Sequence, residues 1–166
     1  MAQNPQNPVR RKPAGGVRAV LIASAERFIA TFSDDGTKCS TDDGPETMIA
    51  CPLIDDRSSF DERLEIRGGV KTVTHTLKLV ADRDAAGRWF HPSFIHLLRH
   101  TGVVARIEMG DGRHLIAGTS ANIPYGQPLK LRSIEALSGC SNADRPTAVM
   151  VLQCTDDAFA AEIDNN

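Results

Sequence analysis

The sequence predicts a mainly β domain of the α+β class. We expect an antiparallel β-sandwich or partly open barrel of about eight strands, with one kinked helix packed against it. Two observations support this fold class. Apolar and polar residues alternate with a period of two over much of the chain, whereas a helical period appears in one segment only. Asp-Gly and Gly-Gly pairs separate the alternating runs, which is typical of hairpins.

The composition is that of an ordinary folded domain. The 166 residues are 41% hydrophobic and 24% charged, which suits one buried core. A net charge of −2 and an aromatic content of 5% argue against sequence-specific nucleic-acid binding. The apolar runs fall far short of the ~20 residues that a membrane-spanning helix needs, so we predict no membrane partner.

Three regions are expected along the chain. Residues 1–16 are polar and Pro-rich, lack the apolar stretch of a secretory signal and include the basic cluster Arg10, Arg11 and Lys12, so we predict a flexible arm. Residues 17–160 form the single β-rich domain, and residues 161–166 a C-terminal tail.

Four cysteines are spread along the chain, at Cys39, Cys51, Cys140 and Cys154. Because no signal peptide is predicted, we interpret them as reduced thiols. Cys51 and Cys154 fall within apolar runs and are expected in the core.

The first half of the chain contains two β-like segments at 17–23 and 27–32, followed by an acidic, turn-rich stretch that we expect to be an exposed loop. The apolar run 48–54 contains Pro52, which suits an edge strand. Two strands with clear alternation then flank Gly68-Gly69. Their apolar faces carry Phe60, Leu64 and Ile66 on the first strand, with Glu62 as an exception, and Val73, His75, Leu77 and Leu79 on the second.

The helical pattern lies between Asp82 and Thr101. Asp82 or Asp84 can cap its start, and Gly102 is placed for its C-terminal turn. Pro92 interrupts the pattern, so we expect a kink or two short helices with Pro92 in the first turn of the second. The apolar stripe of this segment consists of Phe90, Phe94, Leu97, Leu98 and Thr101.

Strands resume after Gly102. Residues 103–109 and 114–119 flank Gly110-Asp111-Gly112-Arg113, a strong hairpin signal. Residues 127–137 and 147–155 form the last predicted pair.

Candidate catalytic and metal-binding residues are sparse. His96 and His100 are four residues apart on the predicted helix, with His91 nearby, and are the candidate metal ligands. The Glu that accompanies such a pair in zinc proteases is absent, because residue 97 is Leu. The acidic residues between 34 and 56 lack the EF-hand rhythm. Ser138-Gly139-Cys140 offers a nucleophile without a marked base. We therefore predict no catalytic residue, no metal, no cofactor and no enzymatic activity.

The second half resembles tailed-phage tail proteins, of the tail tube and tail terminator kind. The similarity covers roughly residues 72–159. It consists of the strand Leu77-Lys78-Leu79-Val80, the helix through Trp89-Phe90, the strand Gly102-Val103-Val104-Ala105, and an ending with Gln127-Pro128-Leu129-Lys130-Leu131, Ser138-Gly139, Asp144-Arg145-Pro146 and the strand 149–155.

This resemblance implies a structural role in a phage, prophage or phage-derived tail. Subunits of such proteins associate in a ring, commonly sixfold, by joining sheets edge to edge around a channel. The implied partners are copies of the same chain and other tail proteins. The implied location is the cytoplasm of a bacterial host, and then the virion or tail-like particle.

Two other readings stay open. One is a small ligand-binding or regulatory β-module with a pocket beneath the helix, lined by Trp89 and Phe90. The other is a metal-dependent enzyme that uses His91, His96 and His100.

Overall fold

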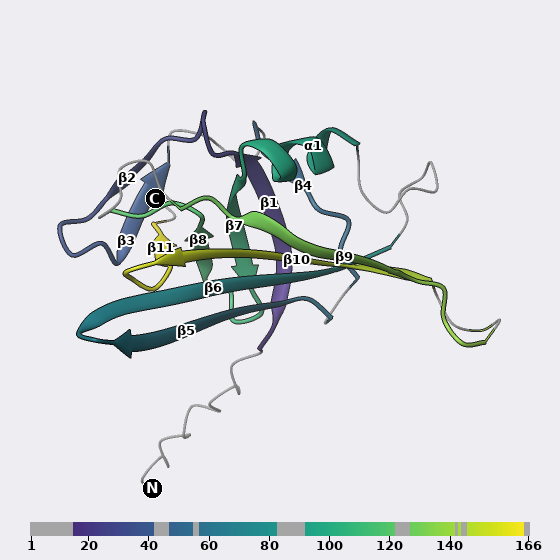
Figure 1. Ribbon diagram of the computed structural model, residues 1–166. Helices are drawn as coiled ribbons and strands as arrows, with labels where there is room; N and C mark the ends of the chain where they lie inside the picture. Colours follow the sequence, from purple (N-terminus) through teal and green to yellow (C-terminus); the bar gives the residue numbers. More distant parts are fainter. Residues whose placement is uncertain are drawn as a thin grey trace, which may run out of the picture.

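The computed structural model describes residues 15–41, 47–54, 57–82, 92–121, 127–141, 143 and 146–164. This part of the chain contains eleven strands and one helix, arranged as two sheets around a common core (Figure 1). The predicted mainly β sandwich is confirmed, and neither sheet closes into a barrel within the described residues. The predicted arm at residues 1–16 lies outside the described part except for Gly15 and Gly16.

The larger sheet has seven strands and short outer strands. In spatial order it contains β2 (Ala30–Phe32), β3 (Lys38–Thr41), β11 (Ala161–Ile163), β8 (His114–Ala117), β7 (Val103–Met109), β1 (Val17–Ser24) and β4 (Ile49–Ala50). β4 lies at one edge, as the run containing Pro52 predicted. β11 pairs with β3 in parallel, and the other neighbouring pairs of this sheet are antiparallel.

The smaller sheet has four long strands. Its order is β5 (Ser59–Arg67), β6 (Val70–Ala81), β10 (Thr147–Asp156) and β9 (Lys130–Leu137), and every neighbouring pair is antiparallel. The β5–β6 hairpin turns at Gly68 and Gly69, whose φ angles of 57° and 78° favour glycine. The alternation predicted for these two strands is confirmed on β6, where Val73, His75, Leu77 and Leu79 are all buried.

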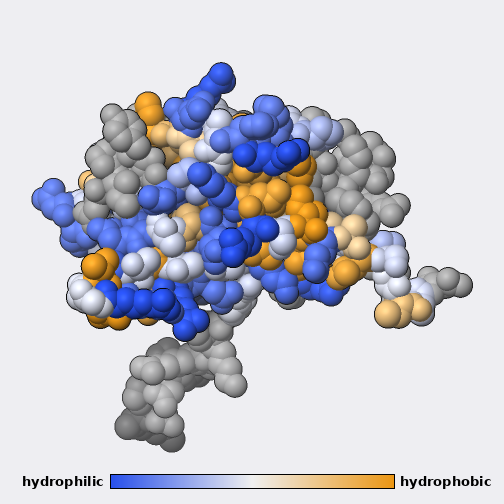
Figure 2. All heavy atoms as spheres, viewed as in Figure 1, coloured by the Kyte–Doolittle hydropathy of each residue, from blue (hydrophilic) through white to orange (hydrophobic). Residues whose placement is uncertain are grey.

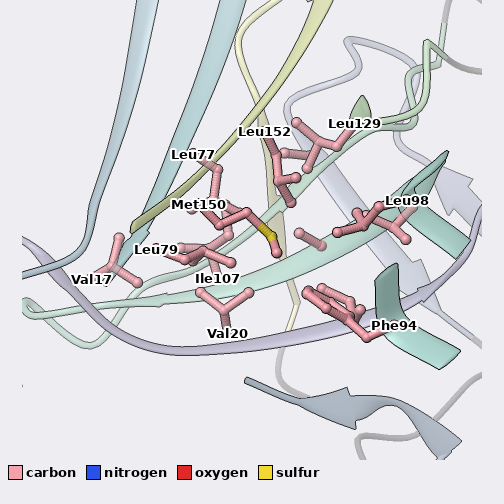
Figure 3. Close-up of a cluster of buried hydrophobic side chains, with 14 of the residues drawn as sticks. Val17, Val20, Leu77, Leu79, Phe94, Leu98, Ile107, Leu129, Met150 and Leu152 are labelled. Carbon is pink, nitrogen blue, oxygen red and sulfur yellow. The ribbon is translucent and has the colours of Figure 1, made fainter. Parts of the chain in front are cut away.

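The main core lies between the two sheets, with the helix α1 (Pro92–His100) at one end (Figure 1). Figure 3 shows Phe94 and Leu98 of α1 pointing toward Val20, Ile107 and Leu129 of the core. Each fully buried side chain of this size contributes about 1.5–3 kcal/mol relative to exposure. The single helix is therefore held mainly by two residues of its apolar stripe, Phe94 and Leu98.

In the described part of the chain, the predicted helical segment 82–101 is helical at Pro92–His100. Asp82, one of the two expected caps, follows β6 directly, and its backbone N–H donates to the Pro52 carbonyl at 3.3 Å, whereas Asp84 lies outside the described residues. Residues 83–91 lie outside the described part. Pro92 is the first residue of α1 in the described part, which agrees with its expected place in the first turn of a helix. At the other end Gly102 has a φ of 73° and donates its N–H to the Leu97 carbonyl, which ends the helix there.

Two strands lie where we expected irregular chain, so the predicted count of about eight was too low. β3 falls inside the stretch expected to be an exposed loop, and β11 falls inside the expected C-terminal tail. Both are too short, at four and three residues, for alternation to reveal them. Tertiary packing defines them, because their apolar residues Cys39, Ala161 and Ile163 are buried in a second cluster on the other face of the large sheet.

Candidate functional site

Among the described residues, the two edges of the four-stranded sheet are open strands, to which no further strand is paired. β5 and β9 are its outer strands, at nine and eight residues. The outer strands of the seven-stranded sheet, β2 and β4, have only three and two residues. A short outer strand offers few backbone groups for pairing, whereas a long one is a template for another strand. The smaller sheet is therefore the one that can be extended by a partner.

Apolar side chains accompany both open strands. Leu64 and Ile66 on β5 are 42% and 68% exposed, and Ile134 and Leu137 on β9 are 41% and 46% exposed. Figure 2 shows apolar surface where β9 and β10 leave the body, and again at the tip of the β5–β6 hairpin. The long strand β9 extends with β10 away from the core toward the right of Figure 1. In the described part of the chain, these exposed apolar residues make the two edges candidate protein contact surfaces.

A hollow of about 570 Å³ lies beside α1. It is lined by residues of β1, of the turn that follows it, of β4 and of the helix: Ile22, Ala23, Ser24, Glu26, Arg27, Thr47, Ile49, His96, Leu97, His100 and Thr101. Its volume is within the range of small-molecule sites. The pocket-lining role expected of Trp89 and Phe90 lies outside the described residues.

The candidate metal ligands are only partly brought together. His96 and His100 are exposed on α1, with ring centroids 4.5 Å apart, and His91 lies outside the described part. Two imidazoles one helical turn apart can share a ligand, but a metal site needs a third donor. Among the residues that the structure describes, no group of three His, Cys, Asp or Glu side chains is placed to hold a metal ion.

A polar row that sequence reasoning missed crosses the smaller sheet. Glu62 lies opposite His75 on β6, which lies opposite Cys154 on β10. The His75 Nε2 is 3.0 Å from the Ala158 carbonyl oxygen and 3.5 Å from the Glu62 carboxylate, which also accepts the Ala160 N–H at 2.5 Å. The row therefore holds the turn between β10 and β11 against the sheet.

Glu62, His75 and Cys154 have the side-chain types of a catalytic triad and lie opposite one another across three strands. Burial raises the pKa of the Cys154 thiol to about 12, so it is protonated at neutral pH and is a poor nucleophile. His75 is 1% exposed. A polar residue on the apolar face of each of two successive strands, Glu62 and His75, was the sequence signal for this pair.

Burial also determines the pKa of two of the other cysteines. All four cysteines are thiols in the structure. Burial raises the pKa of Cys39 to about 11 and that of Cys51 to about 12. Cys39, Cys51 and Cys154 are the shielded cysteines, whereas Cys140 is exposed. The core positions predicted for Cys51 and Cys154 are confirmed by their packing with the main cluster.

Asp35 lies in the acidic stretch and stabilises the turn between β2 and β3. Its carboxylate accepts hydrogen bonds from the Ser33 hydroxyl at 2.6 Å, the Thr37 N–H at 3.0 Å and the Thr37 hydroxyl at 2.8 Å. These donors lower the pKa of Asp35 to about 2, with the Ser33 hydroxyl the largest cause. The carboxylate thus shapes the connection between β2 and β3.

These features define a two-sheet β-sandwich whose smaller sheet has a long strand at each edge. The chain matches no family model, no curated protein and no solved structure with which it was compared. The helix in the described part has nine residues, and no helix there is long and apolar enough to cross a membrane.

Proposed function

We propose that this chain is a structural assembly protein of a phage or phage-derived tail, which forms a ring or tube by self-association. The observation that carries the proposal is the pair of long open strands, β5 and β9, at the two ends of the four-stranded sheet. The resemblance of residues 72–159 to tail tube and terminator proteins supports the same role.

The strand directions favour a head-to-tail joint between copies. Neighbouring strands of the smaller sheet alternate in direction, so its two outer strands, β5 and β9, run in opposite directions. When a second copy is placed beside the first with its strands running in the same directions, β9 of one meets β5 of the next in antiparallel fashion. Such a contact uses different surfaces on the two subunits and closes into a ring when the rotation closes.

Charge on the open strands is also complementary. The β5 sequence, SFDERLEIR, contains two arginines and three acidic residues, which gives a net charge of −1. The β9 sequence, KLRSIEAL, contains Lys130, Arg132 and Glu135, which gives a net charge of +1. Edge strands of opposite net charge attract one another, whereas a charge of one sign on both would keep copies apart.

The test compares wild-type protein with Ile134→Lys by sedimentation velocity and electron microscopy over a wide concentration range. Ile134 is 41% exposed, so the lysine removes little core packing but places a charge on the open edge. We expect wild-type protein to form rings, tubes or concentration-dependent oligomers, and Ile134→Lys to remain monomeric.

The matched control is Ile29→Lys, at a residue that is 64% exposed and lies between β1 and β2, away from the smaller sheet. It should assemble like wild-type protein. A wild-type chain that stays monomeric up to its solubility limit, alone and with other tail proteins, would contradict the proposal. Equal loss of assembly in both lysine variants would also contradict it.

The hollow beside α1 favours a second candidate function, a ligand-binding or regulatory module. His96 and His100 line it together with Arg27 and Glu26, so it offers both hydrogen-bond donors and a carboxylate. Thermal-shift screening of wild-type protein with small anionic and aromatic compounds tests this function. A compound that raises the melting temperature of wild-type protein but not of a His96→Ala, His100→Ala double variant would support it, and a screen without any stabilising compound would count against it.

A further inference from the structure

The face on which each open-strand residue lies is known from its pairing. On β5, Leu64 lies opposite Val73, whose side chain is buried in the core. On β9, Ile134 lies opposite Met150, which is also buried. Leu64 and Ile134 therefore lie on the core face of the sheet. Because side chains alternate, their neighbours Arg63 and Glu135 lie on the outer face.

When β5 of one copy pairs with β9 of another, the core-face side chains of one strand have to lie opposite the core-face side chains of the other. A shift of one residue would place every side chain on the wrong face, so allowed registers differ by two residues. In one register Leu64 lies opposite Ile134, and this places Arg63 directly opposite Glu135. Shifting β9 by two residues in either direction places Glu135 opposite Asp61 or opposite Glu65.

Like charges directly opposite each other destabilise a strand pair, whereas opposite charges and paired apolar residues stabilise it. The Arg63 side chain is 80% exposed, and one of its guanidinium nitrogens is 3.2 Å from Glu65. Glu65 also contacts Arg67 at 3.2 Å, so this single carboxylate is shared between two arginines. The β5 outer face can therefore accept another carboxylate at Arg63.

We propose that β5 of one subunit pairs with β9 of the next in this single register, with Leu64 opposite Ile134 and Arg63 opposite Glu135. The partner surface is a second copy of the same chain. The inference rests on the proposed function, since it requires self-association, but it specifies which atoms meet.

Charge reversal tests the outer-face pair. Arg63→Glu and Glu135→Arg should each weaken self-association, measured by sedimentation equilibrium, by a few-fold to about tenfold per joint, because each places like charges opposite each other. The double variant restores the opposite-charge pair in swapped form and should recover most of the lost affinity. Arg99→Glu, the same charge change on the exposed side of α1, is the control and should assemble like wild-type protein.

Cysteine cross-linking tests the core-face pair in a Cys140→Ala background. Leu64 and Ile134 of one chain are three strand spacings apart across the sheet. Their positions also differ by six residues along the strands, because Leu64 is level with Val73 of β6 and Ile134 with Leu79. About 25 Å therefore separates them, and a disulfide between them cannot form within a subunit. Leu64→Cys with Ile134→Cys should therefore give a ladder of covalent oligomers on oxidation. The out-of-register control, Leu64→Cys with Ala136→Cys, should cross-link much more slowly.

The outcomes separate the register from the proposed function. Wild-type protein that never self-associates would overturn both. Wild-type protein that assembles, with additive losses in the charge variants and equal cross-linking in the two cysteine pairs, would overturn the register and leave the assembly role standing. Restoration by the double charge reversal together with selective cross-linking would establish the register.

Discussion

Gly118→Ala is expected to be strongly destabilising, because this glycine lies where the two sheets are joined. Leu129, just before β9, forms a two-way backbone bridge with Val103 at the start of β7, with N···O distances of 2.9 and 3.0 Å. Gly118 follows β8 and packs against this bridge. A Cβ at residue 118 would lie 2.5 Å from the Val103 carbonyl oxygen and 3.1 Å from the Leu129 nitrogen.

The size of the effect follows from three contributions. The φ of 93° at Gly118 lies in the region that costs an L-residue roughly 1–2 kcal/mol. Relieving a 2.5 Å contact with backbone resembles overpacking, which costs about 1–3 kcal/mol. Displacing the bridge weakens two hydrogen bonds, each of which contributes about 1 kcal/mol. Because these contributions overlap, we expect Gly118→Ala to lower the free energy of unfolding by about 3–5 kcal/mol.

Gly68→Ala is the matched control. Gly68 has a φ of 57° and no atom within 4 Å of a built Cβ, so this variant carries the backbone cost alone. The reduced entropy of the unfolded chain offsets part of that cost, which leaves about 1 kcal/mol. Urea unfolding followed by circular dichroism measures both values. The reasoning is refuted if the losses in free energy of unfolding of the two variants differ by less than about 0.5 kcal/mol, because the clash at the sheet junction would then not destabilise the protein.

Three further outcomes are expected. Glu62→Ala should cost about 1–2 kcal/mol, since the Ala160 N–H loses its acceptor, and should speed hydrogen exchange in β11. The pKa of Asp35 is lowered to about 2 from an ordinary 3.8, so its contribution to stability is present above about pH 4 and is lost as the pH falls through 2. Asp35→Asn should reduce this loss of stability in acid unfolding. A thiol reagent at pH 8 should modify Cys140 quickly and the three shielded cysteines slowly, because burial raises the pKa of each of those thiols.

Each of these outcomes can be contradicted by one measurement. Unchanged exchange in β11 of Glu62→Ala would show that the turn after β10 does not hold that strand. Identical acid-unfolding curves for wild-type protein and Asp35→Asn would show that the Asp35 carboxylate does not contribute to the loss of stability in acid. Asp34→Asn is the neighbouring control. Labelling of more than one thiol at comparable rates in folded protein would show that the core exposes a second cysteine.

Long regular patterns in the sequence predicted most of the secondary structure. The alternation in β6 predicted its buried face from Val73 to Leu79, because every second residue of a strand points to the core. Gly102 predicted where the helix ends, because it acts through its own backbone conformation, and Pro92 was expected in the first turn of a helix, as it is in α1. Glu62 stood out as a polar residue on an apolar face, but its partner at His75 became visible only when the register of β5 and β6 was known.

Only the tertiary structure decided the elements and surfaces that depend on distant residues. β3 and β11 are strands because each lies beside the other in the large sheet, and three or four residues contain no period from which to predict this. The same limit applies to the candidate site. The sequence by itself determined two sheet-forming halves with little catalytic chemistry, but which strands are left at the edges depends on the order of strands in space. That order is set by packing across the core, between residues that are far apart in the chain.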